Sequence, residues 1–462
     1  MTHFTRLSVI LAIALPACGF PRPPAITDDA SAAVDARPGS DAAADSDAAP
    51  ADAAPADAAV SIDARPGTTI RVAGTGDDSN DGITAPVKTL KHAIGLAAAN
   101  DQITSIVLAP GRYESAAGET FPYTLPANII LSGPAGGGAI LAGSNTEPGM
   151  IVNTGALQDL ELEDFTLAIR ATGQARVTNT HVRTKSLAMR AELMAALIVE
   201  NLDIAGAVGA CASGIELAGD ASLTATNLVT RGLSTSVNAH DQSAATLTGA
   251  QTTGDEACAT PSDIGVFMIS TTKTFTLKDS LIDGGLNGLR IVGTSTPTKV
   301  TVQNTTIKNL KAVAISGSKF SLDMTGGEIS NTLGAVTGSL NAELKLTNIA
   351  IKSQRAASIE LGDGLTLVMR SCVVSGFIYV FGNMVIDLGT TASPGNNTLL
   401  SFSDNSSAVE IENGGRVDAV GNTWRPNVQG ADGSGHYAAA TITGPVTPQG
   451  NFQLATGARL QL

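Results

Sequence analysis

Hydrophobic and polar residues alternate in short segments that recur between about residue 160 and residue 376. In the segment from Val300 to Leu310, Val300, Val302 and Ile307 are hydrophobic and Asn304 stands between them. An Asn, Asp, Gly or Ser, which we call the anchor, occupies the Asn304 position in ten segments: Asp164, Asn179, Asn201, Asn227, Gly249, Asp279, Asn304, Gly326, Asn348 and Ser371. The anchors recur on average every 23 residues, a period typical of solenoid proteins.

The positions around the anchors predict two strands joined by a bend. Residues two and four before each anchor are mostly apolar, and those one and three before it are mostly polar, so one face of the strand points into a core and the other into solvent. Three residues after the anchor, eight of ten segments carry Leu, Val or Ile. Asn, Asp and Gly suit a bend because they tolerate a left-handed backbone. The pattern therefore predicts an all-β solenoid.

Two intervals between anchors are irregular. The 15 residues from Asp164 to Asn179 are few for a whole coil, which calls Asp164 into question as the first anchor. The 30 residues from Gly249 to Asp279 leave room for a long loop around residues 255–263.

The first 18 residues are typical of an export signal, with Arg6 followed by an apolar run too short to span a bilayer. The signal ends in Leu15-Pro16-Ala17-Cys18, which resembles a bacterial lipobox. That resemblance implies lipidation of Cys18, and the absence of Asp directly after the cysteine implies the outer membrane or cell surface of a Gram-negative bacterium. An ordinary secretory signal with an incidental cysteine is the alternative.

The composition of residues 19–66 predicts a disordered tether. Ala, Asp and Pro dominate, nine Asp oppose three Arg, and there is too little apolar surface to offset chain entropy. An acidic ligand-binding tail is the alternative. The folded domain is expected over residues 67–462.

The start of this domain carries two further signals. Leu90, Ala93, Ile94 and Ala97 are spaced as on an amphipathic helix over residues 89–99, which we expect to cap the solenoid and cover its exposed strand edges. Asp77, Ser79 and Asp81 match the first half of an EF-hand calcium loop, but Lys88 stands where that loop needs a carboxylate. A Ca²⁺ site and a plain Asx-rich turn both remain open.

Several short motifs resemble the DUF1565 family of bacterial pectin-lyase-like proteins. They are Asn80-Asp81-Gly82, Pro86-Val87-Lys88-Thr89-Leu90, Pro110-Gly111-Arg112-Tyr113, Pro394-Gly395-Asn396-Asn397-Thr398 and Gly421-Asn422-Thr423-Trp424. The resemblance extends over about residues 70 to 462 and implies a right-handed single-stranded parallel β-helix. It implies no activity.

Net charge limits the classes of partner, and the cysteine positions limit the possible disulfides. A net charge of -14 argues against nucleic acid, which requires a basic surface. Cys211 and Cys258 lie at comparable offsets from their anchors, two coils apart, which is too far for a disulfide unless the long loop folds back. Cys372 is expected to be a buried free thiol. We expect a monomer, attached to a membrane through its lipid only.

Outward side chains offer few candidates for chemistry. His181 and Asp203, each two residues after an anchor, are expected to be neighbours with no second carboxylate beside them. Glu161, Glu163 and Glu200 are expected on the opposite strand, and Asp255 and Glu256 on the long loop. We find no outward column of Lys or Arg that would bind an acidic polysaccharide, and only four Tyr and one Trp to stack on sugars.

These observations favour a cell-envelope lipoprotein with a non-catalytic binding or structural role and no required cofactor, a surface or environmental polysaccharide being the candidate ligand. A polysaccharide lyase or glycoside hydrolase on the same fold is the alternative.

The lipid anchor gives a direct prediction. Cys18→Ala removes the thiol that would carry the lipid, so the variant is expected in the soluble fraction after cell breakage, while the wild type sediments with membranes. Retention of the variant in the membrane fraction would contradict lipidation at Cys18.

Overall fold

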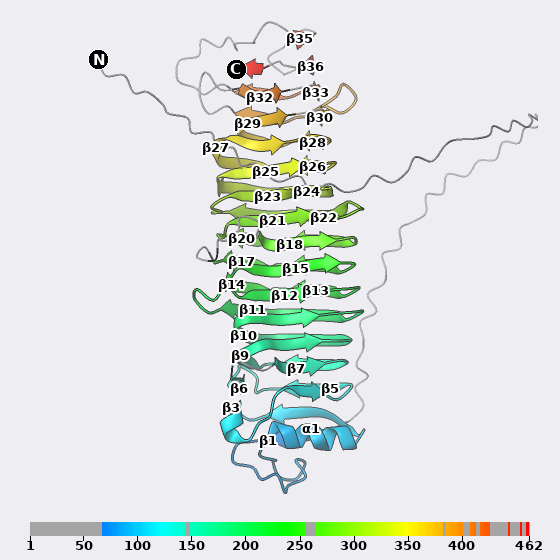
Figure 1. The fold of residues 1–462 in the computed structure, drawn as a ribbon, viewed down its shortest axis with the longest axis vertical. Coiled ribbons are helices and arrows are strands. Elements are labelled where there is room, and N and C mark those ends of the chain that lie inside the picture. Colours follow the sequence, from blue (N-terminus) through cyan, green and yellow to red (C-terminus); the bar gives the residue numbers. More distant parts are fainter. Residues whose placement is uncertain are drawn as a thin grey trace, which may run out of the picture. The chain divides into compact units, whose positions relative to one another are not determined.

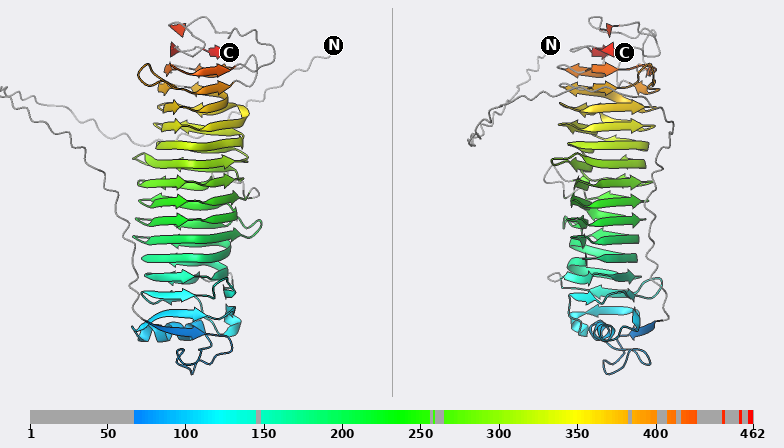
Figure 2. Two further views of the ribbon diagram at one scale, coloured as in Figure 1. Left: turned by 180° about the vertical axis from the view of Figure 1, so that it is seen from behind. Right: turned by 90° about the vertical axis from the view of Figure 1, so that its right-hand side faces the viewer.

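A computed structural model describes residues 67–144, 148–255, 258, 265–381, 385–400, 407–412, 416–425, 442–443, 453–454 and 459–461. Within them the chain winds into coils whose strands stack in three parallel sheets (Figures 1 and 2). The prediction of an all-β parallel β-helix is confirmed. Cys18 and residues 19–66 lie outside the described residues.

The first sheet contains the strands that precede the predicted bend, each paired in parallel with the next coil. Its strands are β1 (Thr68–Val72), β2 (Ile103–Leu108), β5 (Ile129–Ser132), β8 (Gly155–Gln158), β13 (Ser222–Thr226), β16 (Ala244–Thr248), β19 (Thr274–Lys278), β26 (Glu343–Thr347), β28 (Thr366–Arg370), β30 (Val385–Asp387) and β33 (Arg416–Asp418).

The second sheet follows the bend and carries the candidate site. Its strands are β3 (Gly111–Glu114), β6 (Ala139–Ala142), β14 (Val229–Leu233), β17 (Gln251–Gly254), β20 (Leu281–Asp283), β31 (Thr398–Leu400) and β34 (Thr423–Arg425). Long strands bend from the first sheet into the second, namely β11 (Ala196–Gly206), β22 (Thr298–Lys308) and β24 (Phe320–Thr332). The strand β10 (Gln174–Ala191) pairs in all three sheets.

The third sheet completes each coil. Its strands are β4 (Tyr123–Leu125), β7 (Pro148–Val152), β12 (Ser213–Leu217), β15 (Thr235–Asp241), β18 (Gly265–Thr271), β21 (Asn287–Val292), β23 (Val313–Ser318), β25 (Gly334–Ser339) and β32 (Ser407–Glu412). The strands β9 (Glu161–Ala171), β27 (Ala350–Leu361) and β29 (Val373–Phe381) run from the second sheet into the third. Short antiparallel strands follow at β35 (Ile442–Thr443), β36 (Gln453–Leu454) and β37 (Arg459–Gln461).

The bend prediction is confirmed by the backbone. All ten anchors have positive φ, between 46° and 69°. The first anchor, however, is Asp159 (φ 54°) and not Asp164. Glu161 pairs with His181, and Asp159 stands two residues before Glu161 just as the anchor Asn179 stands two residues before His181. Asp164 (φ 59°) instead occupies the second bend, five residues later, where other coils carry Asn or Gly.

Amide side chains link the anchors from coil to coil. Asn179 Nδ2 donates to Asp159 Oδ1 (3.2 Å), Asn201 Nδ2 to Asn179 Oδ1 (3.0 Å) and Asn227 Nδ2 to Asn201 Oδ1 (3.0 Å). Each Asn therefore adopts the left-handed bend and holds its neighbour in register.

Apolar columns fill the interior. Side chains two and four before the anchors are buried, as are Val182, Ile204 and Ile307 three after them. Because burying a Leu, Ile, Val or Phe side chain contributes about 1.5–3 kcal/mol, this repeated column is the main stabilising term. Cys372 is a buried free thiol, as predicted.

The predicted helix is present as α1 (Leu90–Ala99), next to the short 3₁₀ helix η1 (Ser115–Ala117). Thr89 is its N-cap, and the buried Glu119 accepts hydrogen bonds from the N–H groups of Leu90 (2.8 Å) and Lys91 (3.2 Å). Two donors that helix ends leave unpaired are thereby satisfied. The helix packs against β1 and β2, and its role as a cap stays a prediction.

The structure places Cys211 and Cys258 in a disulfide with a Cα–Cα distance of 5.2 Å. Cys211 lies between β11 and β12, and Cys258 lies between β17 and β18, two coils further on. In the coil between them Ser234 alone joins β14 to β15, so no loop holds the two cysteines apart.

The hydrogen bonds that link the anchor side chains from coil to coil, which we call the amide ladder, give a test of register. Asn201→Gly keeps the left-handed backbone but removes two amide hydrogen bonds, and is expected to lower the free energy of unfolding by about 1–2 kcal/mol. Asn201→Ala also strains the backbone and is expected to cost about 1–2 kcal/mol more. Urea denaturation followed by circular dichroism measures both variants, and wild-type stability in both would contradict the role given to the ladder.

Candidate functional site

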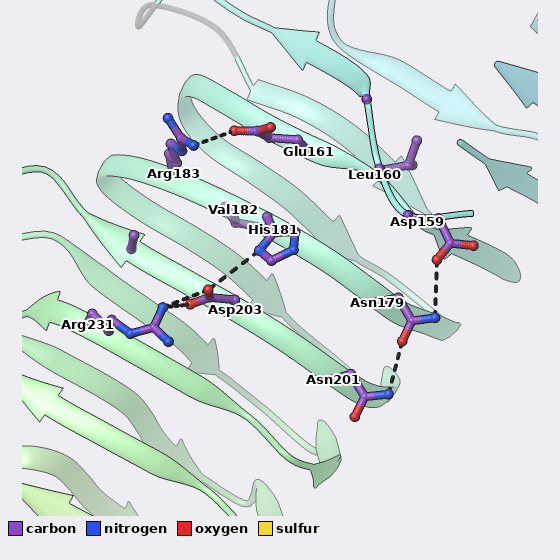
Figure 3. Close-up of a pocket in the computed structure, with 14 residues that line it drawn as sticks. Asp159, Leu160, Glu161, Asn179, His181, Val182, Arg183, Asn201, Asp203 and Arg231 are labelled. Carbon is purple, nitrogen blue, oxygen red and sulfur yellow. Dashed lines mark hydrogen bonds and ion pairs between the residues drawn. The ribbon is translucent and has the colours of Figure 1, made fainter. Parts of the chain in front are cut away.

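The outward face of the second sheet carries a polar groove near the N-terminal end of the β-helix. Its volume is about 830 Å³, and it is lined by residues of β9, β10, β11 and β14 together with the glycine loop 136–138 (Figure 3). This volume lies within the range of roughly 300–1,000 Å³ that is common for small-molecule sites.

Strand register aligns the groove residues in two outward columns. The first, two residues after the anchors, contains Glu161, His181 and Asp203 on three successive coils. The second, four residues after the anchors, contains Glu163, Arg183, Ala205 and Arg231. Strands in neighbouring coils lie about 4.8 Å apart, so each residue stands beside its equivalents in the preceding and following coils.

His181 and Asp203 are neighbours, as the sequence indicated. His181 Nδ1 lies 3.5 Å from Asp203 Oδ2. The expectation that no second carboxylate stands beside them was wrong, because Glu161 pairs with His181 from the preceding coil. Glu161 and Glu163 were expected on the strand before the bend because Asp164 was taken as the bend, but they lie after it, in the second sheet. Glu200 does lie before the bend, in the first sheet.

Arginines bind the carboxylates of the groove diagonally. Arg183 Nη2 lies 3.0 Å from Glu161 Oε1, and Arg231 Nη1 lies 2.8 Å and 2.7 Å from the two oxygens of Asp203. Figure 3 shows both arginines reaching back to the preceding coil. Arg112 pairs with Glu163 in a different arrangement, from β3 two coils earlier.

The cations are the more exposed members of these pairs. The side chains of Arg183, His181 and Arg231 are 68%, 64% and 59% exposed, against 22% for Glu161 and 26% for Asp203. A ligand therefore meets guanidinium and imidazole groups first, with carboxylate oxygens behind them.

The same diagonal pairing occurs far from the groove. Lys352 Nζ lies 3.5 Å from Glu328 Oε1, with the same offset of one coil and two residues. Such pairs are therefore a feature of the surface in general and do not mark a site. Each exposed ion pair contributes at most about 1 kcal/mol to stability. What distinguishes the groove is its hollow and its histidine.

The sequence analysis did not identify the basic residues of the second column. Arg183, Arg231, Lys308 and Lys352 all stand four residues after an anchor, interrupted by Ala205, Thr253, Asp283 and Ser330. No two neighbouring coils both carry a basic residue here, so the expected absence of a continuous Lys or Arg column is not contradicted, but the sequence reasoning missed the recurrence of basic residues at this position. Counting outward positions beyond the second residue after the anchor would have found it.

One wall of the groove is the loop Gly136–Gly138. All three glycines have positive φ, between 92° and 104°, and a Cβ at Gly136 or Gly137 would meet nothing within 4 Å. Backbone conformation rather than lack of space therefore favours glycine at these positions.

The other predicted site residues lie elsewhere. Asp255 follows β17, two coils beyond Asp203, and its N–H donates to Leu233 O (2.9 Å). Glu256 lies outside the residues that the structure describes.

The proposed calcium loop is an Asx-rich turn in this structure. Asp77 Oδ1 accepts from Ser79 N (2.9 Å), and Asp81 Oδ1 accepts from Ile83 N (2.9 Å) and Thr84 N (2.8 Å). These hydrogen bonds, from Ser79 and from Thr84, lower the pKa of Asp77 and of Asp81. Among the described residues no group of three or more His, Cys, Asp or Glu side chains could hold a metal ion.

The chemistry open to the groove is hydrogen bonding at several points. Glu161 and Asp203 are two coils, or roughly 9.6 Å, apart, with His181 between them. Inverting glycosidases hold their two carboxyl groups about 6.5–9.5 Å apart, so this spacing alone is close to a catalytic one. Both carboxylates, however, form ion pairs with an arginine, and Asp203 also accepts hydrogen bonds from Arg231.

The described part of the chain contains no helix that is long and apolar enough to cross a membrane.

Comparison with known proteins gives a family, and solved structures that include the following one. The chain is similar to the catalytic unit of a thermostable GH87 α-1,3-glucanase from Streptomyces thermodiastaticus strain HF3-3, with 12% identity and a TM-score of 0.34. The match covers 78% of this chain and 66% of that one, just under two thirds, and nothing about activity follows from it. No curated protein matches the chain. The sequence pattern of DUF1565, a protein family of unknown function, matches residues 74–364, which leaves the motifs quoted from Pro394 onward outside the match. The chain belongs to the DUF1565 family.

Proposed function

We propose that this protein is an exported, lipid-anchored β-helix that binds a polysaccharide in the groove of the second sheet and does not cleave it. The anchor would be Cys18, and residues 19–66 would hold the folded domain away from the membrane surface. The lipobox-like Leu15-Pro16-Ala17-Cys18 and the Ala, Asp and Pro composition of the tether support this part.

The observation that carries the binding proposal is the row of hydrogen-bonding side chains in the groove. Glu161, His181, Asp203 and the two arginines lie in adjacent columns on four successive coils, and Asn179 and Asn201 border them. Sugars bind proteins through several hydroxyl groups at once, and a rigid sheet that already positions the partners reduces the entropic cost of binding.

The arginine pairs favour binding over cleavage. A glycosidase needs one carboxylic acid to protonate the leaving oxygen and one carboxylate to act as base or nucleophile. In this groove Arg231 engages both oxygens of Asp203 and Arg183 engages Glu161.

A glycoside hydrolase is the second candidate, and the spacing of Glu161 and Asp203 is the observation that favours it. Cleavage would require Arg183 or Arg231 to move aside when substrate binds.

A glycan array combined with a degradation assay separates these functions. We expect the purified protein to bind at least one polysaccharide, with and without calcium, and to release neither reducing ends nor unsaturated sugars. Arg231→Gln is expected to weaken binding on the order of tenfold, because a hydrogen bond to a charged group is worth about 1.5–3 kcal/mol. Lys352→Gln removes a similar ion pair outside the groove and is the matched control. Released sugar products that disappear in Asp203→Asn would favour the hydrolase instead.

A further inference from the structure

The groove differs from a typical acidic-ligand site in its balance of charge. Its lining carries three carboxylates, Asp159, Glu161 and Asp203, and two guanidinium groups, Arg183 and Arg231, with His181 between them. Asp159 is also bound, accepting from Asn179 Nδ2 (3.2 Å) and from Gln158 Nε2 (3.0 Å). The chain as a whole carries a net charge of -14. An anionic polymer approaching the groove would meet nearby carboxylates and an unfavourable long-range field.

Donors and acceptors alternate along the groove. Glu161 and Asp203 accept, Arg183 and Arg231 donate, and the amides of Asn179 and Asn201 do both. A sugar hydroxyl is itself one donor and an acceptor, so it can bridge an arginine and the carboxylate behind it. A carboxylate or sulfate on a ligand only accepts, and it would leave the oxygens of Glu161 and Asp203 facing like charge.

The length of the arrangement sets the size of the ligand. From Glu161 to Arg231 the columns cover four successive coils, a span of roughly 14 Å. The volume of about 830 Å³ lies near the upper end of the usual range for single-ligand sites. Both values suit several linked sugar units better than one.

We infer that the groove of the second sheet recognises a neutral, polyhydroxylated oligosaccharide segment, lying across the Glu161–Arg183 and Asp203–Arg231 pairs. This inference rests on the proposed function and adds the ligand class. Each ion pair presents a donor and an acceptor edge to neighbouring hydroxyl groups, and charge neutrality within the pairs excludes acidic glycans.

Isothermal titration calorimetry with two sets of short oligosaccharides tests the ligand class. The neutral set contains glucose, mannose and xylose oligomers, and the acidic set contains galacturonate and mannuronate oligomers of matched length. We expect the protein to bind a neutral oligomer with little dependence on salt concentration, and to bind the acidic set at least about tenfold more weakly.

A charge-removal variant makes the test specific to the groove. Glu161→Gln with Asp203→Asn leaves Arg183 and Arg231 without their carboxylates, so affinity for the neutral oligomer is expected to fall and affinity for acidic oligomers to rise. Glu328→Gln, at the remote pair with Lys352, is the control and is expected to change neither. Wild-type circular dichroism and urea midpoints in all variants show that the fold is kept.

The outcomes distinguish this inference from the function on which it rests. Tighter binding of acidic than of neutral oligomers by the wild type, or unchanged neutral affinity in the double variant, overturns the inference and leaves polysaccharide binding in place. If neither set binds, the proposed function fails as well.

Discussion

Parallel hydrogen bonding between neighbouring coils, kept in one register along the β-helix, is the constraint on which the rest of this structure depends. Because each residue pairs with its equivalent in the next coil, inward side chains form continuous apolar columns and outward side chains form continuous surface columns. The left-handed anchors and their amide bonds fix where each strand bends. A shift of one residue in any coil would exchange its buried and exposed faces.

The candidate site is a direct result of this register. Glu161, His181 and Asp203 are 42 residues apart in sequence from first to last, yet the pairing of β9, β10 and β11 places them in one column. The diagonal ion pairs follow from the same geometry, because a long Arg or Lys side chain reaches the short carboxylate one coil before it. The parallel sheet holds the backbone of these residues in place, and the glycine loop forms one wall of the groove.

The sequence predicted the fold well because burial repeats. Three aligned columns over ten segments specify the bends, and each anchor residue predicted to bend has a positive φ. The site was predicted less well, since an outward residue carries no periodic signal of its own and its neighbours depend on where the register starts. Placing the first bend at Asp164 instead of Asp159 moved Glu161 to the wrong sheet and hid its contact with His181. The basic residues could have been found four positions after the anchors, but which carboxylate each arginine contacts depends on side-chain direction. The glycine wall depends on loop conformation, which the repeat pattern does not encode.

The central claim is that register in the second sheet builds a glycan-binding groove at Glu161, His181, Asp203 and Arg231. A crystal structure of the protein soaked with a neutral oligosaccharide tests it most directly. The account predicts an intact oligosaccharide lying over these four residues and Arg183, with its hydroxyl groups bridging the Glu161–Arg183 and Asp203–Arg231 pairs. A cleaved sugar in the groove, or an intact one bound on another face while the groove holds only water, would contradict it.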